Sequence, residues 1–205
     1  MTAVYWARHG ENAANVSRRF SHRIFDGDLT DRGVRQADQL AAALQASEHH
    51  YGLLACSPLR RARQTAQIVS ARLGLPVWAE LEDLREVDVG DLDGRNDDSA
   101  WQIYNAVLEE WRSGQLDRRF PGGESGNELT DRISRALRVI AGRAGSDDAV
   151  VVAHGASIRA AIPALTGRPD PGADLPTGAL ASLSVTLASG EVASIGLTAW
   201  PGRAG

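Results

Sequence analysis

The sequence contains a single cysteine, Cys56, in 205 residues. One cysteine cannot form a disulfide within the chain and cannot build a cysteine-based metal site. Because Cys56 follows the apolar run Leu53-Leu54-Ala55, we expect a buried and inert thiol at the end of a strand. The pair His49-His50 is not accompanied by carboxylates or cysteines at a matching ligand spacing. The sequence therefore predicts no metal site and no cofactor.

Long apolar runs and an excess of positive charge are also absent. No segment approaches the ~18 apolar residues that a membrane-spanning helix needs, and the N-terminus lacks the basic and apolar regions of a secretion signal. The net charge of −4 provides no overall attraction for nucleic acid or an acidic membrane surface. We expect a soluble, cytoplasmic protein without nucleic-acid or membrane partners, in which a local cluster of arginines binds any anionic substrate.

The composition and the order of the expected elements indicate one α/β domain over residues 1–205. Apolar residues make up 43% and charged residues 23%, a balance that argues against disorder. Strands that alternate with helices favour a largely parallel sheet. Strands are expected at 4–7, 53–56, 77–79, 149–153 and 181–187. Two helices are expected to begin at 29–31 and after Ser57-Pro58, and two more to span 100–111 and 127–144. The turn candidate Ser189-Gly190 predicts a final antiparallel hairpin at an edge.

Two apolar strands end in the same dipeptide. The first is followed by His9-Gly10 and the other by His154-Gly155. Because the carboxyl ends of parallel strands meet at one edge of a sheet, both histidines are expected there. Either histidine alone is read more simply as a satisfied polar residue at a strand end. The repetition of the pattern favours a site.

The second strand delivers Arg61 to the same edge, in a helix expected to begin with Ser57 as N-cap and Pro58 at the first position. A cation in the first turn opposes the helix dipole. A solvated surface arginine tolerates this, whereas the functional interpretation is that Arg61 and the helix N-terminus face the same anion. With Arg8 and the two histidines, Arg61 would form a positive pocket suited to a phosphoryl group, whose oxygens match the planar guanidinium.

The ordered set of these and further segments resembles the histidine phosphatase superfamily, also called the phosphoglycerate mutase-like family. The resemblance covers nearly the whole chain and implies a three-layer α/β/α sandwich with a mostly parallel central sheet. Departures from the family pattern at Asn12, Ala14 and His22 are expected to alter the pocket rim. The matching segments are Arg8-His9-Gly10-Glu11, Asn15, Arg19-Phe20-Ser21, Asp28-Leu29-Thr30 with Gly33, Ser57-Pro58-Leu59 with Arg61-Ala62, Gln64-Thr65-Ala66, Leu84-Arg85-Glu86 with Gly90 and Gly94, Gly122-Gly123-Glu124-Ser125 and His154-Gly155.

The resemblance implies a role for each matching residue. His9 would be the nucleophile and Glu86 the proton donor, although Glu86 read without the family is a loop carboxylate paired with Arg85 or Arg95. Neutral imidazole can attack phosphorus directly, and guanidiniums can stabilise the equatorial oxygens without a metal. Arg8, Arg61 and His154 would complete the catalytic set by binding the phosphoryl oxygens, with help from Asn15. The further substrate-binding residues are expected to be Ser21, His22 and Gly155, although His22 is interpreted equally well as part of a solvated loop.

Hydrolysis of a small phosphomonoester is the expected activity. The alternatives are a cofactor-dependent phosphoglycerate mutase, for which the chain looks too short, and a non-catalytic module that binds phosphorylated ligands. A nucleotide-binding protein is disfavoured, because neither strand–helix turn carries a glycine-rich fingerprint. The stretch from Ala100 to Gly126 is expected to cap the site, with Trp101, Tyr104 and Trp111 interpreted as helix core rather than substrate contacts. The C-terminal hairpin offers an edge for a possible homodimer.

Overall fold

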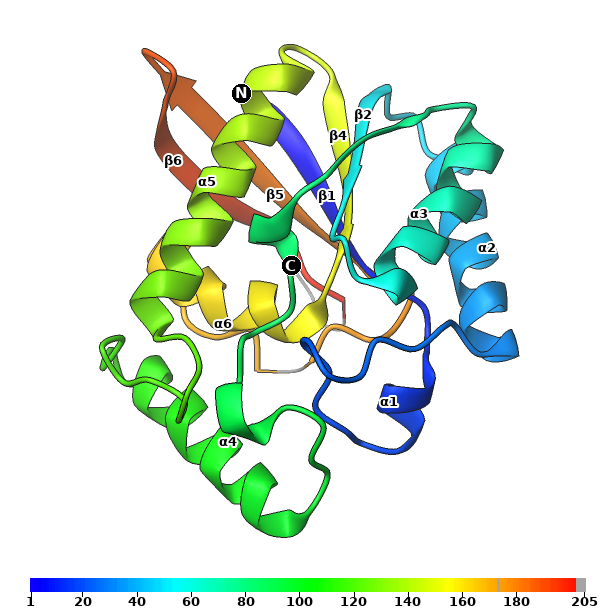
Figure 1. Cartoon of the computed structure of the whole chain (residues 1–205). Coiled ribbons are helices and arrows are strands. Elements are labelled where there is room, and N and C mark those ends of the chain that lie inside the picture. The colour runs from blue at the N-terminus through cyan, green and yellow to red at the C-terminus, as the bar shows by residue number, and fades with distance from the viewer. Residues whose placement is uncertain (173, 202–205) are drawn as a thin grey trace.

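A six-stranded sheet in the order β3-β2-β4-β1-β5-β6 runs through the centre of the computed structural model, which describes residues 1–172 and 174–201 (Figure 1). The first four strands in the chain are parallel, and the last two are antiparallel to their neighbours. A largely parallel sheet is therefore confirmed. The strands are β1 (Thr2–Arg8), β2 (Tyr51–Cys56), β3 (Val77–Glu80), β4 (Asp148–Ala153), β5 (Leu180–Ala188) and β6 (Glu191–Ala199).

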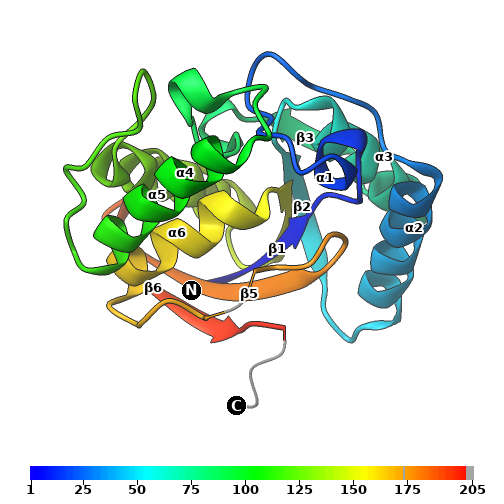
Figure 2. The same ribbon diagram turned by 90° about the horizontal axis from the view of Figure 1, so that it is seen from below.

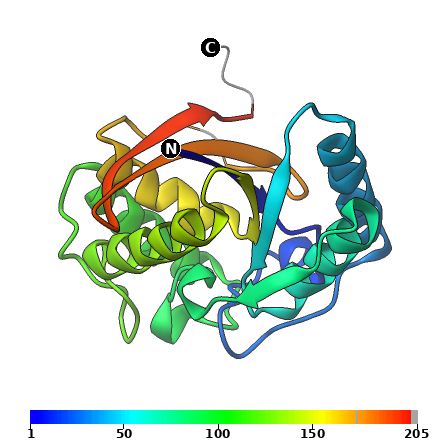
Figure 3. The ribbon, with the colours of Figure 1, turned by 90° about the horizontal axis from the view of Figure 1, so that it is seen from above.

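Helices cover both faces of this sheet, which confirms the three-layer sandwich. Seen from above, α2 and α3 lie on one side of the sheet, and α4, α5 and α6 on the other (Figure 3). Alternate residues of β4 face opposite layers: Val150 and Val152 pack with α2 and α3, whereas Ala149 and Val151 pack with α5 and α6. The helices are α1 (Ala13–Val16), α2 (Asp31–Ala46), α3 (Arg60–Leu73), α4 (Asp98–Arg112), α5 (Gly126–Ala144) and α6 (Gly155–Thr166).

Local sequence signals set most of the boundaries. Thr30 caps α2 by accepting a hydrogen bond from the amide of Gly33, and Gly74 ends α3 in the left-handed conformation at φ 64°. At the β5–β6 turn, Ser189 and Gly190 both have positive φ, as a tight hairpin turn requires. The expected edge hairpin is thereby confirmed. Among the described residues, no helix is long and apolar enough to cross a membrane.

The carboxyl ends of the parallel strands converge at one edge of the sheet. Arg8 of β1 pairs with Ala153 of β4, and the amide of Ser57, just after β2, donates to the carbonyl oxygen of Val152 at 2.9 Å. Figure 2 looks toward this edge and shows α1, α4 and α6 around the ends of the strands. The sheet register thus places the segments after β1, β2 and β4 next to one another.

Candidate active site

Two histidines lie side by side where β1 and β4 end. The amide of His9 donates to the carbonyl oxygen of Ala153 at 3.0 Å, so the parallel ladder continues one residue beyond β1. His154 directly follows Ala153, and the centroids of the two imidazole rings are 5.1 Å apart. The structure therefore brings together the two histidines that the strand ends predict.

His9 is held as a neutral imidazole with a defined tautomer. Its Nδ1 lies 2.7 Å from the carbonyl oxygen of Gly10, while Arg61 Nε donates to its Nε2 at 3.0 Å. Both contacts are satisfied when the proton is on Nδ1 and the lone pair is on Nε2. Burial, followed by the charges of Arg61 and Arg8, lowers the pKa of His9 well below its usual value. The ring is therefore a free base at neutral pH.

Arg61 bridges the two histidines from the first turn of α3. Its side chain is almost fully buried, and Nη2 donates to Nδ1 of His154 at 3.3 Å and to the Ser21 carbonyl oxygen at 2.9 Å. Its carboxylate partner is Asp26, at 3.4 Å from Nη1. Burial lowers the pKa of Arg61, yet a guanidinium remains charged in proteins. One long ion pair leaves this buried cation suited to a second anion.

His154 has the opposite tautomer to His9. Its Nδ1 accepts from Arg61, so Nε2 carries the proton and donates to Ser57 Oγ at 2.8 Å. Burial and the Arg61 charge lower its pKa well below the usual value. The expected role of Ser57 as N-cap is wrong, because α3 begins at Arg60 with Leu59 as N-cap. The Ser57 hydroxyl instead orients His154.

Arg8 enters the site from the last residue of β1. Its Nη1 donates to the carbonyl oxygen of Leu175 at 2.6 Å, and its buried Nε has no hydrogen-bond acceptor within the described part of the chain. A buried guanidinium N–H without a partner costs free energy unless a ligand supplies the acceptor. Gly155 makes room for this side chain, since a Cβ there would lie 2.8 Å from Arg8 Cδ.

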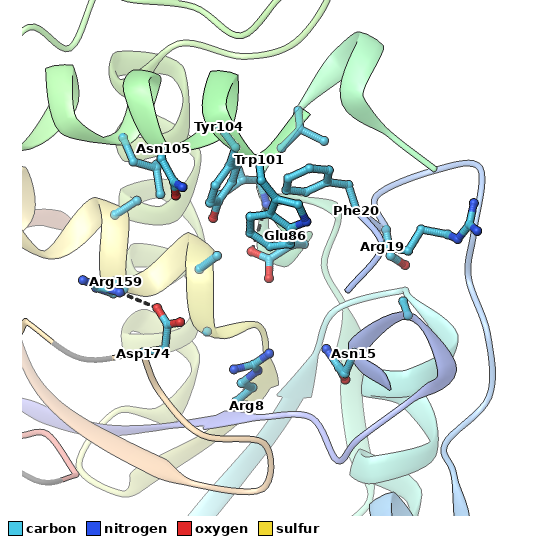
Figure 4. Close-up of a pocket in the computed structure, with 18 of the residues that line it drawn as sticks. Arg8, Asn15, Arg19, Phe20, Glu86, Trp101, Tyr104, Asn105, Arg159 and Asp174 are labelled. Atoms are coloured by element: carbon cyan, nitrogen blue, oxygen red, sulfur yellow. Dashed lines mark hydrogen bonds and ion pairs between the residues drawn. The ribbon is translucent and has the colours of Figure 1, made fainter. Parts of the chain in front are cut away.

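Glu86 faces the same space as Arg8 (Figure 4). Its Oε1 accepts hydrogen bonds from the amide of Val87 at 3.0 Å and from the amide of Ser157, in the first turn of α6, at 2.8 Å. No hydrogen bond to Oε2 is found among the residues described, so that oxygen can carry or accept a proton. The interpretation of Glu86 as a loop carboxylate paired with Arg85 or Arg95 is not supported, because these arginines pair with Glu82 and Asp97.

Asn15 and Ser21 also border the site. Asn15 Oδ1 accepts from the amide of Asn12 at 3.0 Å in a capping box, which turns the Asn15 amide nitrogen toward the cavity (Figure 4). Ser21 donates its hydroxyl to the carbonyl oxygen of Phe25 and accepts from Arg61 Nη1 at 3.1 Å. Both residues line the cavity, and their binding of substrate stays a prediction.

His22 does not lie where a substrate contact was expected. Its side chain is buried away from the cavity lining, with Nδ1 2.9 Å from the Glu86 carbonyl oxygen and Nε2 3.8 Å from Asp88. The loop that carries His22 packs under the Glu86 segment, so the imidazole supports that segment from behind. Burial lowers the pKa of His22, with Asp88 acting in the opposite direction.

Comparison with known proteins identifies the architecture of this site. The family model of the histidine phosphatase superfamily (branch 1) matches residues 4–198. The chain belongs to this superfamily. It is 34% identical over 169 residues to a probable phosphoglycerate mutase, GpmB, of Escherichia coli, covering 82% of this chain and 77% of the relative. It is 32% identical over 167 residues to an uncharacterized phosphatase, PhoE, of Bacillus subtilis, covering 82% and 79%.

Solved histidine phosphatase structures match nearly all of the fold. A protein described as mycobacterial hydrolase 1 superposes with a TM-score of 0.81 at 26% identity, covering 100% of both chains. A mycobacterial glucosyl-3-phosphoglycerate phosphatase superposes with a TM-score of 0.79 at 25% identity, covering 98% of both. The chain is therefore similar both to relatives named as mutases and to relatives named as phosphatases.

A cavity of about 260 Å³ opens from His9 toward α4, and His154 lies behind His9 without being part of the cavity lining. The aromatic side chains of α4, predicted to be core only, also form its wall: Trp101, Tyr104 and Trp111 all line it. Tyr104 stacks on Phe120 with ring centroids 5.6 Å apart and shows its hydroxyl toward the cavity (Figure 4). The segment expected to cap the site therefore borders it, and its aromatic residues have two contacts, core and cavity.

Arg132 is the main site-supporting residue that the sequence did not reveal. From α5 it forms a two-point ion pair with Glu124, with both N–O distances 2.8 Å. It also donates to the carbonyl oxygens of Asp83, Arg85 and Glu86. Its sequence signal is weak, because a charged residue beside the apolar face of a helix is ordinarily solvated.

Proposed function

We propose that the protein is a phosphomonoester hydrolase that forms a phosphohistidine on His9 and requires no metal. The observation that carries this proposal is the environment of His9, a neutral imidazole whose Nε2 accepts from Arg61 and which shares one cavity with Arg8 and Glu86. A nucleophile, charge stabilisation and a proton donor are the three groups that phosphoryl transfer needs. All three border one cavity.

In the first step, the Nε2 lone pair of His9 attacks phosphorus and the bond from phosphorus to the ester oxygen breaks. Arg61 exchanges its hydrogen bond with Nε2 for one with a phosphoryl oxygen, and the unpartnered Nε of Arg8 donates to another. A doubly negative phosphoryl group raises the pKa of His154, which can then take up a proton from solvent at Nδ1 and share it with a phosphoryl oxygen. Protonated Glu86 transfers its proton from Oε2 to the leaving oxygen, so that an alcohol departs.

In the second step, water attacks the phosphorus of the phosphohistidine. Glu86, now a carboxylate, takes one proton from this water as the oxygen–phosphorus bond forms and the nitrogen–phosphorus bond breaks. Inorganic phosphate leaves, and the neutral imidazole and protonated Glu86 are restored. The guanidiniums of Arg8 and Arg61 carry the charge stabilisation that a metal ion supplies in other phosphatases.

The test combines phosphate release with trapping of the intermediate. We expect the native protein to release phosphate from an aryl phosphate in the presence of a chelator, and His9→Ala to abolish release. His50→Ala is the matched control, because His50 is an exposed histidine outside the cavity. Rapid quenching in base, followed by mass spectrometry, should find one phosphoryl group on His9. Activity that survives His9→Ala would overturn the mechanism.

Transfer to a second substrate in place of water is the alternative that the mutase-named relatives raise. It is measured in the same assay by comparing phosphate released with substrate consumed. Release equal to consumption supports hydrolysis. Isomerisation of a phosphoglycerate without phosphate release would replace hydrolysis by mutase activity while leaving His9 as the nucleophile.

A further inference from the structure

The part of the cavity beyond Glu86 is lined by rings and aliphatic side chains. Its wall is formed by one face of α4 and one face of α6, which approach each other over the strand ends (Figure 2). An apolar wall of this kind contributes binding free energy to a ligand with a flat or cyclic apolar face. The side chains that form the wall are Phe20, Trp101, Tyr104, Leu108, Trp111, Ala160 and Pro163.

Both arginines at the far end of the cavity are neutralised. Asp170 accepts from Arg159 Nε at 3.0 Å through Oδ1 and from Arg112 Nε at 2.6 Å through Oδ2. Arg159 also pairs with Asp174, and Arg112 with Glu109 at 3.1 Å. Of these three carboxylates, Asp170 and Asp174 line the cavity and Glu109 does not, so two carboxylates balance two guanidiniums there. A carboxylate or second phosphate on the substrate would therefore find neither guanidinium unpaired.

The remaining cations of the cavity do not face a second anion either. Arg8 and Arg61 lie at the reacting end, where the transferred phosphoryl group occupies them. Arg19 donates to the carbonyl oxygen of Gly94 at 2.5 Å and packs over Phe25 at 5.8 Å from the ring centroid. Figure 4 shows its guanidinium turned away from Glu86 and Arg8. No arginine of the described cavity lining is thus left to recognise a second anion beyond the phosphoryl group.

We infer that the substrate is a phosphomonoester whose leaving group carries no anionic charge and contains a ring bearing hydroxyl groups. The ring packs on the aromatic wall of α4, and the hydroxyls bond to the Asn105 amide and to the Asp170 and Asp174 carboxylates. Sugars and nucleosides share this chemistry. The inference rests on the proposed function for the orientation of the phosphoryl group, and it selects against phosphoglycerates, whose leaving group carries a carboxylate.

Two aryl phosphates that differ only in the charge of the para substituent test the inference. They are para-hydroxymethylphenyl phosphate, which is neutral beyond the phosphoryl group, and para-carboxyphenyl phosphate. Binding to the His9→Ala protein is measured by calorimetry, so the result does not depend on turnover. We expect the neutral ester to bind about tenfold more tightly, because the carboxylate would lose hydration in the cavity without gaining an unpaired cation as partner. Equal or tighter binding of the carboxylate would overturn the inference.

Asp174→Asn identifies the source of the discrimination. Asp174 is largely exposed and Arg159 keeps its bond to Asp170, so the fold should tolerate the change. The preference for the neutral ester over the carboxylate ester, measured as the ratio of their binding constants, is expected to fall about threefold. This is the size of effect that one partly exposed charge pair produces. The matched control is Asp38→Asn, which breaks an exposed pair with Arg72 outside the cavity and should leave the preference unchanged. An unaltered preference in Asp174→Asn would place the discrimination elsewhere and contradict the assignment.

Turnover separates this inference from the proposed function. If the native protein hydrolyses the neutral ester faster than the carboxylate ester, both stand. If it prefers the carboxylate ester, hydrolysis stands and the inference fails. If it hydrolyses neither, the function fails, and the binding preference alone decides the inference. A hexose phosphate and a nucleoside monophosphate then distinguish the two sources of the ring, and tighter binding of glycerol phosphate than of both would refute the ring requirement.

Discussion

Arg132 is predicted to control proton donation by Glu86 although it does not line the cavity. Its guanidinium donates to the carbonyl oxygens of Asp83, Arg85 and Glu86 at 2.8, 2.8 and 3.1 Å, and it is fixed by the two-point ion pair with Glu124. These bonds hold the backbone on both sides of the Glu86 side chain. Without these bonds, Glu86 Oε1 would lose its fixed position at the amide of Ser157 in α6. Oε2 would then lose its alignment with the leaving oxygen.

The perturbation must separate this effect from loss of stability. Replacing Arg132 alone leaves the buried Glu124 carboxylate unpaired, which costs about 3–5 kcal/mol. For a chain of this size, such a loss lowers the melting temperature by roughly 6–20 °C. The double variant Arg132→Met with Glu124→Gln removes both charges. In the native protein the amide of Asp88 donates to Glu124 Oε1 at 2.8 Å, and the side-chain oxygen of a glutamine can accept the same hydrogen bond. We expect it to remain folded, with a melting temperature closer to that of the native protein.

The assay compares kcat/KM for para-nitrophenyl phosphate with kcat/KM for an alkyl phosphate. Para-nitrophenolate leaves without a proton, whereas an alkoxide requires one, so general acid catalysis worth about 10²–10⁴-fold acts mainly on the alkyl ester. The measured quantity is kcat/KM for the alkyl phosphate divided by kcat/KM for para-nitrophenyl phosphate. In Glu86→Gln this ratio should fall by most of that factor, and in the double variant it should fall at least about tenfold.

The matched control is Arg135→Met, also on α5, whose exposed guanidinium pairs with the Asp83 side chain. It should leave the ratio unchanged. A folded double variant that keeps the native ratio would refute the role assigned to Arg132.

Three further predictions concern the buried histidines and the space around Arg8. Because the pKa values of His9 and His154 are lowered in the folded state, the unfolded chain binds more protons than the folded chain below pH ~6.5. The free energy of unfolding should therefore fall as the pH falls, by up to about 1.4 kcal/mol per histidine per pH unit. Urea unfolding at several pH values should show a weaker pH dependence in the variants His9→Gln and His154→Gln. Vanadate or phosphate should raise the melting temperature of the native protein, and less so that of Arg8→Ala, by binding the folded state only. Gly155→Ala should lower kcat/KM about tenfold by displacing Arg8 from alignment, whereas Gly142→Ala, where a new Cβ meets nothing closer than 3.8 Å, should not.

The elements that position the reacting groups were predictable because their signals are local. An apolar strand that ends in His-Gly places a polar ring at a sheet edge, and two such strands in parallel register place two rings together. Thr30 before α2 and Gly74 after α3 act through the capping bonds of the adjacent helix. In each case, the residues that determine the structure lie within a few positions of it.

The contacts that failed to be predicted join segments far apart in the chain. The Ser57-Pro58 pattern predicts that Ser57 caps a helix, yet its hydroxyl accepts a hydrogen bond from His154, 97 residues away in the chain. His22 was expected either at the substrate or in a solvated loop, but its imidazole is buried with Nδ1 2.9 Å from the Glu86 carbonyl oxygen. Loop-to-loop packing of this kind follows no hydrophobic period, so nothing in the local pattern indicates which polar side chain becomes buried.

The same electrostatic arrangement explains both the reactivity of His9 and the expected sensitivity of the fold to acid. Two guanidiniums and burial keep the imidazole unprotonated, which makes the nucleophile available without a separate base. They also leave positive charge with little compensation at the edge of the sheet. A phosphoryl dianion supplies that compensation, and protonation of the dianion to a monoanion at acidic pH weakens it. Phosphate should therefore raise the free energy of unfolding more at pH 7 than at pH ~5.5, and less in Arg8→Ala than in the native protein; equal protection of the two proteins would show that phosphate does not meet this charge.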